Sequence, residues 1–418
     1  MVRLKLCFAS EAFQHRPLKM TFGTFCRFLR RLTREVAPEI LFSLWHRWLR
    51  RVGPSLRRYR QARKRGELAP PFLFLSLTSA CNLRCQGCWV TPENRAKHLP
   101  PALVHQLIES GKKRGLFFYT LLGGEPLLYP WLWEILERHR ECYFQIITNG
   151  TGINEEVATR WRKLGNVTPL VSVDGFAPTN DRRRGTGTYH RICQALHYLR
   201  QKRLFFGVAT TISRDNFEEV LSPGFVREMV GQGAMYLWYY ILRPMGSPET
   251  AQLCLTAEQI VEVRRRLLQL RRHHPLLIID TYWDEKGRAI CPAALGLGYH
   301  IGPEGSIEPC PPLSVASESI QNGTDPLGTI LGSRFLRDFA QFVNERTRGC
   351  VILENPKELT RFLRNSGARD YSQGRLFACL ENQPALPSHH QPQAEIPEDS
   401  WLYRMLKRRL FFGLAGYG

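Results

Sequence analysis

The stretch Cys81-Asn82-Leu83-Arg84-Cys85-Gln86-Gly87-Cys88 directly follows an apolar, strand-like run from Phe72 to Leu77. Three cysteines spaced CxxxCxxC can place three thiolates on one small iron–sulfur cube, which leaves the fourth iron without a protein ligand. Clusters that only carry electrons usually have four cysteine ligands, so the open iron indicates a site for a substrate or cofactor. The alternatives are three unrelated thiols or a zinc loop, but zinc sites bring CxxC pairs or histidines at set spacings.

The bulk composition bounds the class of protein. The chain has 418 residues, enough for a large core or two domains, with 43% hydrophobic and 23% charged residues. A net charge of +21 favours an anionic partner such as nucleic acid, acidic lipid or an acidic peptide. Twelve cysteines, and too short an apolar run in Met1–Ser10 for a signal peptide, predict a reducing, cytoplasmic setting. No stretch approaches ~20 uninterrupted apolar residues, so no spanning helix is expected.

The segment from Met20 to Gly66 is basic and amphipathic. Its apolar residues recur at helical spacing on either side of Pro38, which suits the first turn of a second helix. Arginines opposite tryptophans and phenylalanines fit an interfacial helix pair on an anionic bilayer, at the inner membrane face. A helical prefix packed on the domain behind it, with a solvated basic face, is the equal alternative. A nucleic-acid arm is disfavoured, because the aromatic residues lie on the apolar face and are not interleaved for stacking.

From Phe72 onward, apolar strand-like runs alternate with helical patterns. The predicted strands are Phe72–Thr78, Phe117–Leu122, Tyr143–Thr148, Pro169–Val173, Phe205–Thr211 and Met235–Leu242. The predicted helices between them are Pro101–Arg114, Trp131–Arg140, Glu155–Lys163, Tyr189–Lys202 and Phe217–Gly231. Regular alternation predicts an α/β fold with a parallel sheet, and six units suit a barrel or partial barrel whose chemistry lies beyond the carboxyl ends of the strands. Pro244-Met245-Gly246 then closes the barrel, before a helix Leu255–His273 and a short strand Leu276–Tyr282.

Polar and glycine-rich segments follow three of these strands. They are Gly123-Gly124-Glu125-Pro126, Thr148-Asn149-Gly150-Thr151 and Ser172-Val173-Asp174-Gly175, with Asn180-Asp181-Arg182-Arg183-Arg184-Gly185 further on. Paired glycines let a backbone approach a ligand closely, and a glutamate can accept hydrogen bonds from an ammonium group. The alternatives are a plain turn for the first segment, an Asx-turn for the second and a solvated charge run for the last.

In this order, from about Phe72 to Cys310, the motifs resemble those of the radical S-adenosylmethionine (radical SAM) superfamily. The resemblance implies a partial (β/α)6 TIM barrel in which Cys81, Cys85 and Cys88 hold a 4Fe–4S cluster. In that family the open iron chelates the methionine moiety of S-adenosylmethionine, and an electron from the cluster cleaves the sulfonium to a 5′-deoxyadenosyl radical. The family usually has an aromatic residue just before the third cysteine, where this chain has Gly87. Trp89 is predicted to cover the adenine in its place.

The resemblance also assigns the cofactor-binding residues. Glu125, with the backbone of its GGEP segment, would bind the methionine amino group, and Arg184 would hold the carboxylate as a bidentate fork. Asn180 stands where the family has a histidine. The remaining residues implied to lie near the cofactor are Gly123, Gly124, Pro126, Thr148, Asn149, Ser172 and Asp174. The sequence assigns no residue as a proton or hydrogen donor to the substrate.

A second cysteine pattern starts at Cys291 and ends in Gly305-Ser306-Ile307-Glu308-Pro309-Cys310. It resembles the opening of the auxiliary-cluster domains called SPASM or twitch, and Pro303–Ser306 suits the turn of a hairpin between the two cysteines. The compact cysteine block of a full SPASM domain is absent, and only Cys350 and Cys379 follow. Four thiolates suffice for one closed cluster, so a small α+β, twitch-like domain with a second 4Fe–4S cluster is predicted. The other cysteines are expected to be buried as small hydrophobic residues: Cys7, Cys26, Cys142, Cys193 and Cys254.

The last part of the chain is less specific. Residues Gln383–Asp399 are rich in Pro, His and Gln and are expected to be a linker. Within it, His389-His390 is expected to be solvent-exposed, with metal binding as the alternative. The tail Trp401–Phe412 repeats the basic-aromatic composition of the N-terminal segment. The predicted division is therefore 1–70 helical extension, 71–280 barrel, 281–382 auxiliary domain and 383–418 linker and tail.

These features predict a radical SAM oxidoreductase or maturase that abstracts hydrogen from a peptide or lipid-like substrate. An electron donor such as flavodoxin or ferredoxin is implied, and nucleic acid is not an expected partner. The alternative is a non-catalytic iron–sulfur or redox-sensing protein that docks on an anionic membrane through its basic helices. Loss of the GGEP carboxylate or of one loop cysteine would have favoured that alternative, and both are present.

Overall fold

A computed structural model of the chain describes residues 22–90, 96–245, 248–321 and 323–409. Several predicted features lie outside these residues: the Met1–Ser10 segment, Cys7, Gly246 and the end of the tail from position 410. Among the described helices, none is both long enough and apolar enough to cross a membrane.

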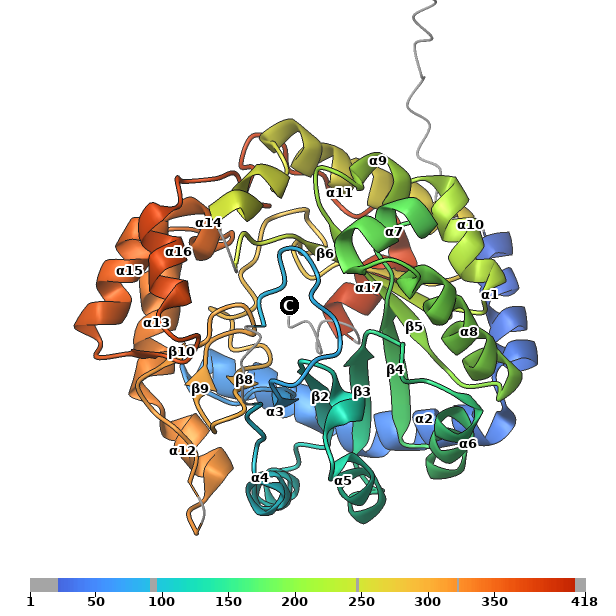
Figure 1. The fold of residues 1–418 in the computed structure, drawn as a ribbon, viewed down its shortest axis with the longest axis horizontal. Coiled ribbons are helices and arrows are strands. Elements are labelled where there is room, and N and C mark those ends of the chain that lie inside the picture. Colours follow the sequence, from blue (N-terminus) through green and yellow to red (C-terminus); the bar gives the residue numbers. More distant parts are fainter. Residues whose placement is uncertain (1–21, 91–95, 246–247, 322, 410–418) are drawn as a thin grey trace, which may run out of the picture.

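The fold is a mixed α/β barrel that is open on one side (Figure 1). Its sheet has the order β7-β6-β5-β4-β3-β2-β1-β8-β9. The first seven strands are parallel, and β8 pairs parallel to β1 and antiparallel to β9. The strands are β1 (Leu73–Thr78), β2 (Phe118–Gly123), β3 (Tyr143–Thr148), β4 (Val167–Ser172), β5 (Gly207–Ile212), β6 (Tyr236–Ile241), β7 (Leu277–Ile279), β8 (His300–Ile301) and β9 (Ile307–Glu308). The six predicted strands are confirmed, and the short strand predicted after them extends the same sheet as β7.

Helices cover the outside of the barrel. Those between strands are α4 (Pro101–Lys113), α5 (Leu132–Arg138), α6 (Glu155–Leu164), α7 (Ala177–Arg184), α8 (Thr188–Gln201), α9 (Phe217–Val220), α10 (Pro223–Gly231) and α11 (Ala257–His273). The predicted helix over 217–231 is two helices, because Ser222 caps α10 through Phe225 N–H (3.1 Å) and Pro223 starts it. Helix α7 was not predicted, since its sequence has no apolar periodicity and buries only Asn180 and Arg184.

The strands are buried on both faces, but the barrel interior is partly polar. Thr168 and Tyr236 hydroxyls lie 3.0 Å apart, and Gln145 donates to the same tyrosine from β3 at 3.4 Å. Trp238 and Tyr240 stack on β6 with ring centroids 5.7 Å apart. Polar and aromatic side chains of β3, β4 and β6 therefore meet on one face of the sheet.

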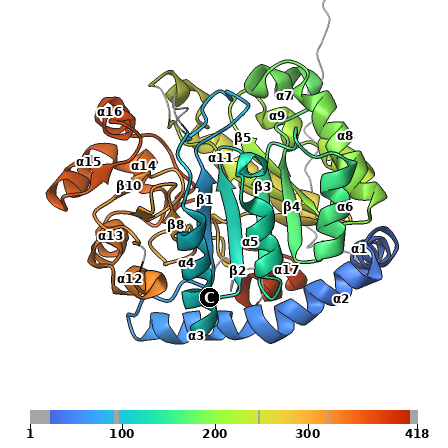
Figure 2. The same ribbon diagram turned by 60° about the horizontal axis from the view of Figure 1, so that its bottom comes forward.

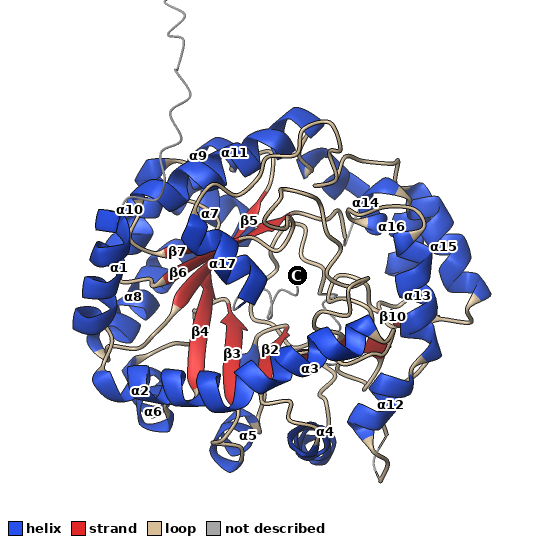
Figure 3. Ribbon diagram, turned by 180° about the vertical axis from the view of Figure 1, so that it is seen from behind, coloured by secondary structure: helices blue, strands red, loops and turns tan. Residues whose placement is uncertain are grey.

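Three helices of the N-terminal segment form a floor under the amino-terminal ends of the strands (Figures 2 and 3). They are α1 (Phe22–Glu35), α2 (Pro38–Arg47) and α3 (Gly53–Lys64), with a π-helical turn at Trp48–Val52. Val52 and Leu56 pack against Phe72, Phe118 and Tyr143, which close the bottom of the barrel. The packed helical prefix is thus the arrangement seen, and Pro38 begins the second helix as predicted.

Arginines of this floor donate hydrogen bonds to carbonyls at the ends of barrel helices. Arg31 donates to the carbonyl of Pro275 beyond α11 (2.9 Å), and Arg47 to that of Gly165 after α6 (3.1 Å). Further bonds of this kind join Arg27 to His273 and Arg58 to Gly115. Cations at helix carboxyl termini are stabilising, because the last carbonyls have no partner within the helix. Part of the basic charge of this segment therefore has a structural role.

Helix α17 (Trp401–Arg409) lies along the free edge of β7. The Tyr403 hydroxyl accepts a hydrogen bond from Ile278 N–H (2.9 Å), and Arg271 of α11 donates to the carbonyl of the same residue (3.0 Å). Leu402 and Leu406 pack beside them in a small apolar cluster. Both main-chain groups of the central β7 residue are thus satisfied by side chains.

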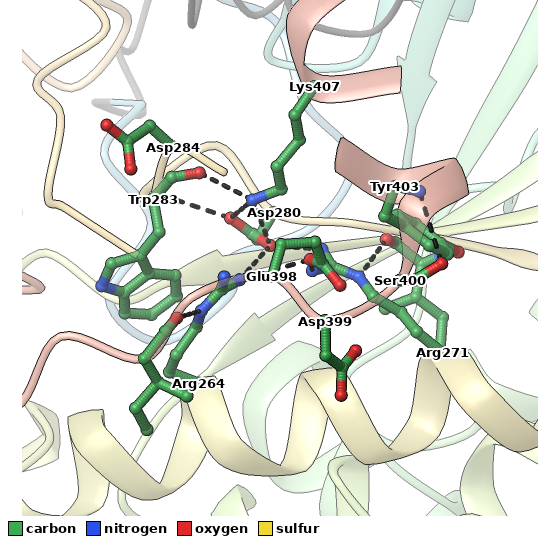
Figure 4. Close-up of polar contacts among 12 residues, drawn as sticks. Arg264, Arg271, Asp280, Trp283, Asp284, Glu398, Asp399, Ser400, Tyr403 and Lys407 are labelled. Atoms are coloured by element: carbon green, nitrogen blue, oxygen red, sulfur yellow. Dashed lines mark hydrogen bonds and ion pairs between the residues drawn. The ribbon is translucent and has the colours of Figure 1, made fainter. Parts of the chain in front are cut away.

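A buried ion cluster joins α11, β7 and α17 (Figure 4). Asp280 pairs with Arg271 and with Lys407 (3.3 Å), and Arg271 pairs with Glu398 (2.6 Å). Arg264 lies 3.5 Å from Asp280, so three cations share two carboxylates. Burial, with repulsion from both guanidiniums, lowers the pKa of Lys407 to about 7 against the attraction of Asp280. The same cations hold the pKa of Asp280 well below its usual range despite burial.

The remaining elements lie on the side of the barrel that carries β8 and β9 (Figure 1). It contains β10 (Val315–Ala316), β11 (Arg369–Asp370), α12 (Pro326–Gly332), α13 (Arg334–Asn344), α14 (Val351–Glu354), α15 (Pro356–Asn365) and α16 (Arg375–Asn382). The predicted hairpin is present as β8–β9, and through β1 it belongs to the main sheet.

Two expectations for single side chains were wrong. His389 is buried, not exposed: its Nε2 lies 2.8 Å from the carbonyl of Ile290, and burial lowers its pKa to about 3. The linker that carries it has no regular structure but packs against Tyr282 and Trp283. Cys26 is exposed on α1. The remaining single thiols stay closer to expectation, with Cys142 and Cys254 buried and Cys193 half-buried.

Candidate active site

The cysteine loop lies at the carboxyl end of β1 and is tied down at both ends. Ala80 N–H donates to the Thr78 hydroxyl (2.9 Å), and Gln86 N–H donates to the carbonyl of Arg183 in α7 (2.8 Å). Figure 1 shows the loop crossing the mouth of the barrel. The loop is therefore held against two parts of the barrel that are about a hundred residues apart in the sequence.

The three thiols of the loop affect one another electrostatically. Burial raises the pKa of Cys81 and of Cys88, and the neighbouring Cys85 adds to both shifts. Within the described residues, no three Cys, His, Asp or Glu side chains surround a single ion. Three partly buried thiols on one anchored loop are a candidate ligand set for an iron–sulfur cluster.

Gly87 stands in the loop where the resemblance predicts an aromatic residue. Its φ is +67°, a left-handed conformation that glycine adopts without strain, which accounts for glycine at this position. Trp89, predicted to cover the adenine, has its ring edge-on to that of His300, with centroids 5.6 Å apart. Trp89 thus lies at the side of the loop that faces the β8–β9 hairpin.

The two glycines of GGEP allow a close approach of protein backbone. A Cβ on Gly123 would lie 2.3 Å from the carbonyl oxygen of Thr78, and one on Gly124 would lie 2.0 Å from that of Ala80. Gly124 N–H and Glu125 N–H donate to these two carbonyls, each at 2.7 Å. The GGEP turn is therefore packed directly on the start of the cysteine loop, and any side chain there would push the two apart.

Glu125 is buried at the centre of this arrangement. Its carboxylate accepts from the Thr148 hydroxyl (2.7 Å), Asn149 N–H (2.7 Å) and Leu127 N–H (3.1 Å). Burial raises the pKa of Glu125, while these hydrogen bonds and Arg184 oppose the rise. The Asn149 amide in turn donates to Asn82 (2.8 Å) and lies 3.9 Å from the Cys81 sulfur. The GGEP and TNG segments thus meet at the cysteine loop, as the sequence predicts.

Asp174 is the anchor of the arginine segment. It pairs with Arg183 and, at 2.6 Å, with Nε of Arg184, and it accepts from Thr211 N–H at 2.8 Å. Burial alone would raise the pKa of Asp174, but the guanidiniums of Arg183 and Arg184 hold this pKa below its usual range. Arg184 is buried and close enough to Cys85 and Cys88 for their thiolates to favour its charge. The arginine run is therefore not a solvated charge run.

The remaining predicted residues lie on the same edge of the sheet. Ser172 ends β4 beside Ala209 of β5 and is partly exposed. Pro126 is buried and begins the short turn after Glu125. Asn180, in place of the family's histidine, accepts from Asp174 N–H at 3.1 Å. Asn180 therefore orders the arginine segment without facing solvent.

Three of the predicted auxiliary ligands lie close enough to affect one another electrostatically. Burial raises the pKa of Cys291 to about 11, and that of Cys310 well above the ordinary value, with Cys350 adding to both. Cys379 lies buried on α16.

Sequence reasoning missed two further residues beside these thiols. Arg243, just after β6, bonds Tyr282 (2.7 Å) and faces Cys350. Cys254 is buried near the same arginine and cysteine. The position of Arg243 directly after a barrel strand was the one signal that could have marked it.

Comparison with protein families matches residues 75–222 to the Radical SAM superfamily. An AdoMet-dependent heme synthase of Methanosarcina barkeri is 29% identical over 41% of this chain and 51% of its own length. Mycofactocin maturase MftC of Mycobacterium tuberculosis is 34% identical over 32% of this chain and 36% of its own length. The chain thus spans about half, or less, of the length of these curated relatives.

Among solved structures, SuiB of Streptococcus suis has the same fold. Its complex with S-adenosylmethionine aligns with a TM-score of 0.57 at 17% identity, over 70% of this chain and 72% of that one. Its complex with the precursor peptide SuiA aligns with a TM-score of 0.55 at 16% identity, over 71% and 72%. The likeness supports the partial barrel predicted from the sequence.

Proposed function

Residues 75–222 form a radical SAM domain, and on that premise we propose that this chain reductively cleaves S-adenosylmethionine and abstracts hydrogen from a substrate. The observation that carries the proposal is the meeting of the cysteine loop, Glu125 and Arg184 at one end of the barrel. When bound, a 4Fe–4S cluster with an open iron supplies the electron that breaks the sulfonium bond.

The residues around the loop divide the work of binding the cofactor. Cys81, Cys85 and Cys88 would ligate the cluster. The Glu125 carboxylate would accept hydrogen bonds from the methionine ammonium, and Arg184 would pair with the methionine carboxylate. Asp174 is a positioning residue, because it pairs with Nε of Arg184 and not with the terminal amino groups that would meet the methionine carboxylate.

A second cluster on Cys291, Cys310 and Cys350 belongs to this proposal. These thiols influence one another electrostatically, which is expected of residues that share one site. Cys379 is the fourth ligand expected from the sequence, and Cys254 is a second candidate because it lies near Cys350. Arg243 would place a positive charge beside the cluster. The predicted division at 71–280 and 281–382 would give each cluster its own segment.

We propose a peptide as the substrate. SuiB, which shares the fold, is described in complex with a precursor peptide, and a maturase is among the relatives in sequence. These comparisons favour a peptide over the lipid-like substrate also considered from the sequence. A flavodoxin or ferredoxin would deliver the electron.

A peripheral contact with an anionic membrane is a second proposal. Phe42 and Trp45 on α2 are 64% and 60% exposed, although their floor is otherwise packed. Arg30 and Arg34 on α1 and Arg50 in the π-helical turn, which precede and follow α2 in the sequence, are exposed as well. Aromatic rings beside arginines suit the headgroup region of an acidic bilayer. Loss of sedimentation with phosphatidylglycerol vesicles in a Phe42→Ser, Trp45→Ser variant, but not in Trp131→Ser, would support it.

Anaerobic reconstitution followed by a 5′-deoxyadenosine assay tests the main proposal. We expect the cluster of the cysteine loop to contribute about four irons per chain. We also expect 5′-deoxyadenosine to form when dithionite and S-adenosylmethionine are added. Cys85→Ala should lose the irons of the loop cluster and the formation of 5′-deoxyadenosine. Cys26→Ala, at an exposed position on α1, should keep the iron and the activity. Iron bound without any product, even with a flavodoxin-type reductant, would support the non-catalytic iron–sulfur protein instead. Cys310→Ala should lower iron by about one cluster's worth without loss of cleavage; unchanged iron would exclude the second cluster.

A further inference from the structure

A small cavity of about 50 Å³ lies between the carboxyl end of β1 and the β8–β9 hairpin. Trp89, the residue after the loop's third cysteine, and Gly123 of GGEP both line it, so it adjoins the proposed cofactor site. Its walls are rich in hydroxyl groups, contributed by Ser76, Thr78, Ser79, Ser306, Ser314 and Ser372. A pocket with these walls suits a polar substrate group.

One of these hydroxyls begins a buried hydrogen-bonded chain. The Ser76 hydroxyl lies 2.7 Å from Nε2 of His300, and Nδ1 of His300 lies 2.6 Å from Glu308 Oε2. The Ser306 hydroxyl donates to the other oxygen of Glu308 at 2.6 Å. All four residues line the cavity, and each is almost fully buried.

The neighbours of His300 determine which atom donates in each of these hydrogen bonds. A carboxylate beside Nδ1 places the imidazole proton on that nitrogen, which leaves Nε2 free to accept from Ser76. The Ser76 oxygen keeps its lone pairs for a further partner, and Ser76 lines the cavity. A hydroxyl, a histidine within hydrogen-bond reach and a third group that orients the histidine are the parts needed to activate an oxygen.

The absence of a side chain at Gly302 leaves space for the Ser306–Glu308 hydrogen bond. Gly302 lies so close that a Cβ there would be 2.3 Å from the Ser306 hydroxyl and 2.7 Å from Glu308 Oε1. The hairpin is already joined to β1 through its main chain, where His300 pairs with Phe74. A buried polar chain is therefore not needed to attach the hairpin, and burying it is costly unless every group is satisfied.

We propose that Ser76, His300 and Glu308 form a proton relay that opens into this cavity and takes a proton from the bound substrate. Ser76 Oγ accepts the substrate proton as its own proton passes to His300 Nε2, and Glu308 orients the imidazole through Nδ1. The electron pair of the broken bond stays on the substrate atom, so the step needs no oxidant. That the cavity holds substrate rests on the proposed function; the activation of Ser76 does not.

A fluorophosphonate probe tests the relay directly. In its reaction an Oγ–phosphorus bond forms, fluoride leaves, and the hydroxyl proton passes to the histidine. With the reconstituted full chain, we expect peptide mass spectrometry to find the adduct on Ser76. Ser76→Ala should abolish it, and His300→Gln should slow labelling at least tenfold. Ser366→Ala, which removes a hydroxyl outside the cavity at the end of α15, should leave labelling intact.

Two outcomes would overturn the relay: no adduct on Ser76 of the folded wild-type chain, or labelling that His300→Gln does not slow. The wild-type result stands even if a variant fails to fold, and melting temperature and iron content identify that case. Labelling needs neither the cluster's electron nor S-adenosylmethionine. Failure of the relay and failure of cofactor cleavage are therefore separate results.

Discussion

Two regions of the molecule hold many cations, and they hold them in different ways. Around Asp280, the cations Arg264, Arg271 and Lys407 are buried and share carboxylates. In the floor helices, arginines such as Arg31 and Arg47 donate to main-chain carbonyls near the surface. In the first region the charges depend on one another, so removing a carboxylate leaves buried cations without a partner. In the second region the arginines bond main-chain carbonyls, and Arg31 also pairs with Glu35 on its own helix. The cations behind the net charge of +21 therefore fall into groups with different structural roles.

The largest effect is expected from breaking the first region at its centre. Asp280→Asn would leave three buried cations with Glu398 as their one carboxylate. Breaking a buried ion pair by removing one partner costs about 3–5 kcal/mol, because the other charge stays buried. Urea unfolding should show this loss. A loss below about 1 kcal/mol would mean that water reaches the cluster.

A smaller, pH-dependent effect is expected from Lys407. Its pKa is about 7 in the folded chain and ~10.4 when unfolded, so between these values the unfolded chain binds the extra proton. The free energy of unfolding should therefore rise as pH increases from about 7 to about 10, by at most ~1.4 kcal/mol per pH unit.

Lys407→Met should remove that rise without lowering stability at neutral pH. Lys64→Met, at an exposed position on α3, should keep it. Unfolding curves at several pH values compare the three chains, and an equal slope in all of them would contradict the assignment.

The smallest effect is expected in the floor. Arg47→Gln removes hydrogen bonds to the carbonyls of Gly165 (3.1 Å) and Arg140 (3.0 Å), and should cost about 1 kcal/mol. Arg50→Gln, at an exposed position nearby, should change stability by less than about 0.5 kcal/mol. An equal loss of stability in Arg47→Gln and Arg50→Gln would mean that the hydrogen bonds of Arg47 to main-chain carbonyls do not stabilise the fold.

Much of the barrel could be predicted from the sequence because its signals are local. The strand Tyr143–Thr148 was predicted to the residue, since a β-rich apolar run ends there in Asn-Gly. The cysteine loop, GGEP and TNG were expected at one edge, because parallel strands place their carboxyl ends together. Helix α7 escaped prediction because its buried residues are polar, and only tertiary partners such as Asp174 make them buried.

The parts that could not be predicted depend on contacts between distant segments. His389 looked like part of a solvated linker, and only its packing on Tyr282 shows otherwise. The Ser76–His300 bond joins residues 224 positions apart, with no shared motif. Likewise, nothing local distinguishes an arginine that caps a helix from one that faces solvent.

The packing of α17 along β7 also affects how the chain folds during synthesis. Ile278 would otherwise present an unpaired N–H and carbonyl at the edge of a long sheet, a template to which another molecule can add a strand. Tyr403 of α17 occupies that edge but leaves the ribosome more than a hundred residues after the strand. During synthesis the sheet is therefore open to self-association until α17 docks, and a chain cut before Trp401 would stay open and be prone to aggregation.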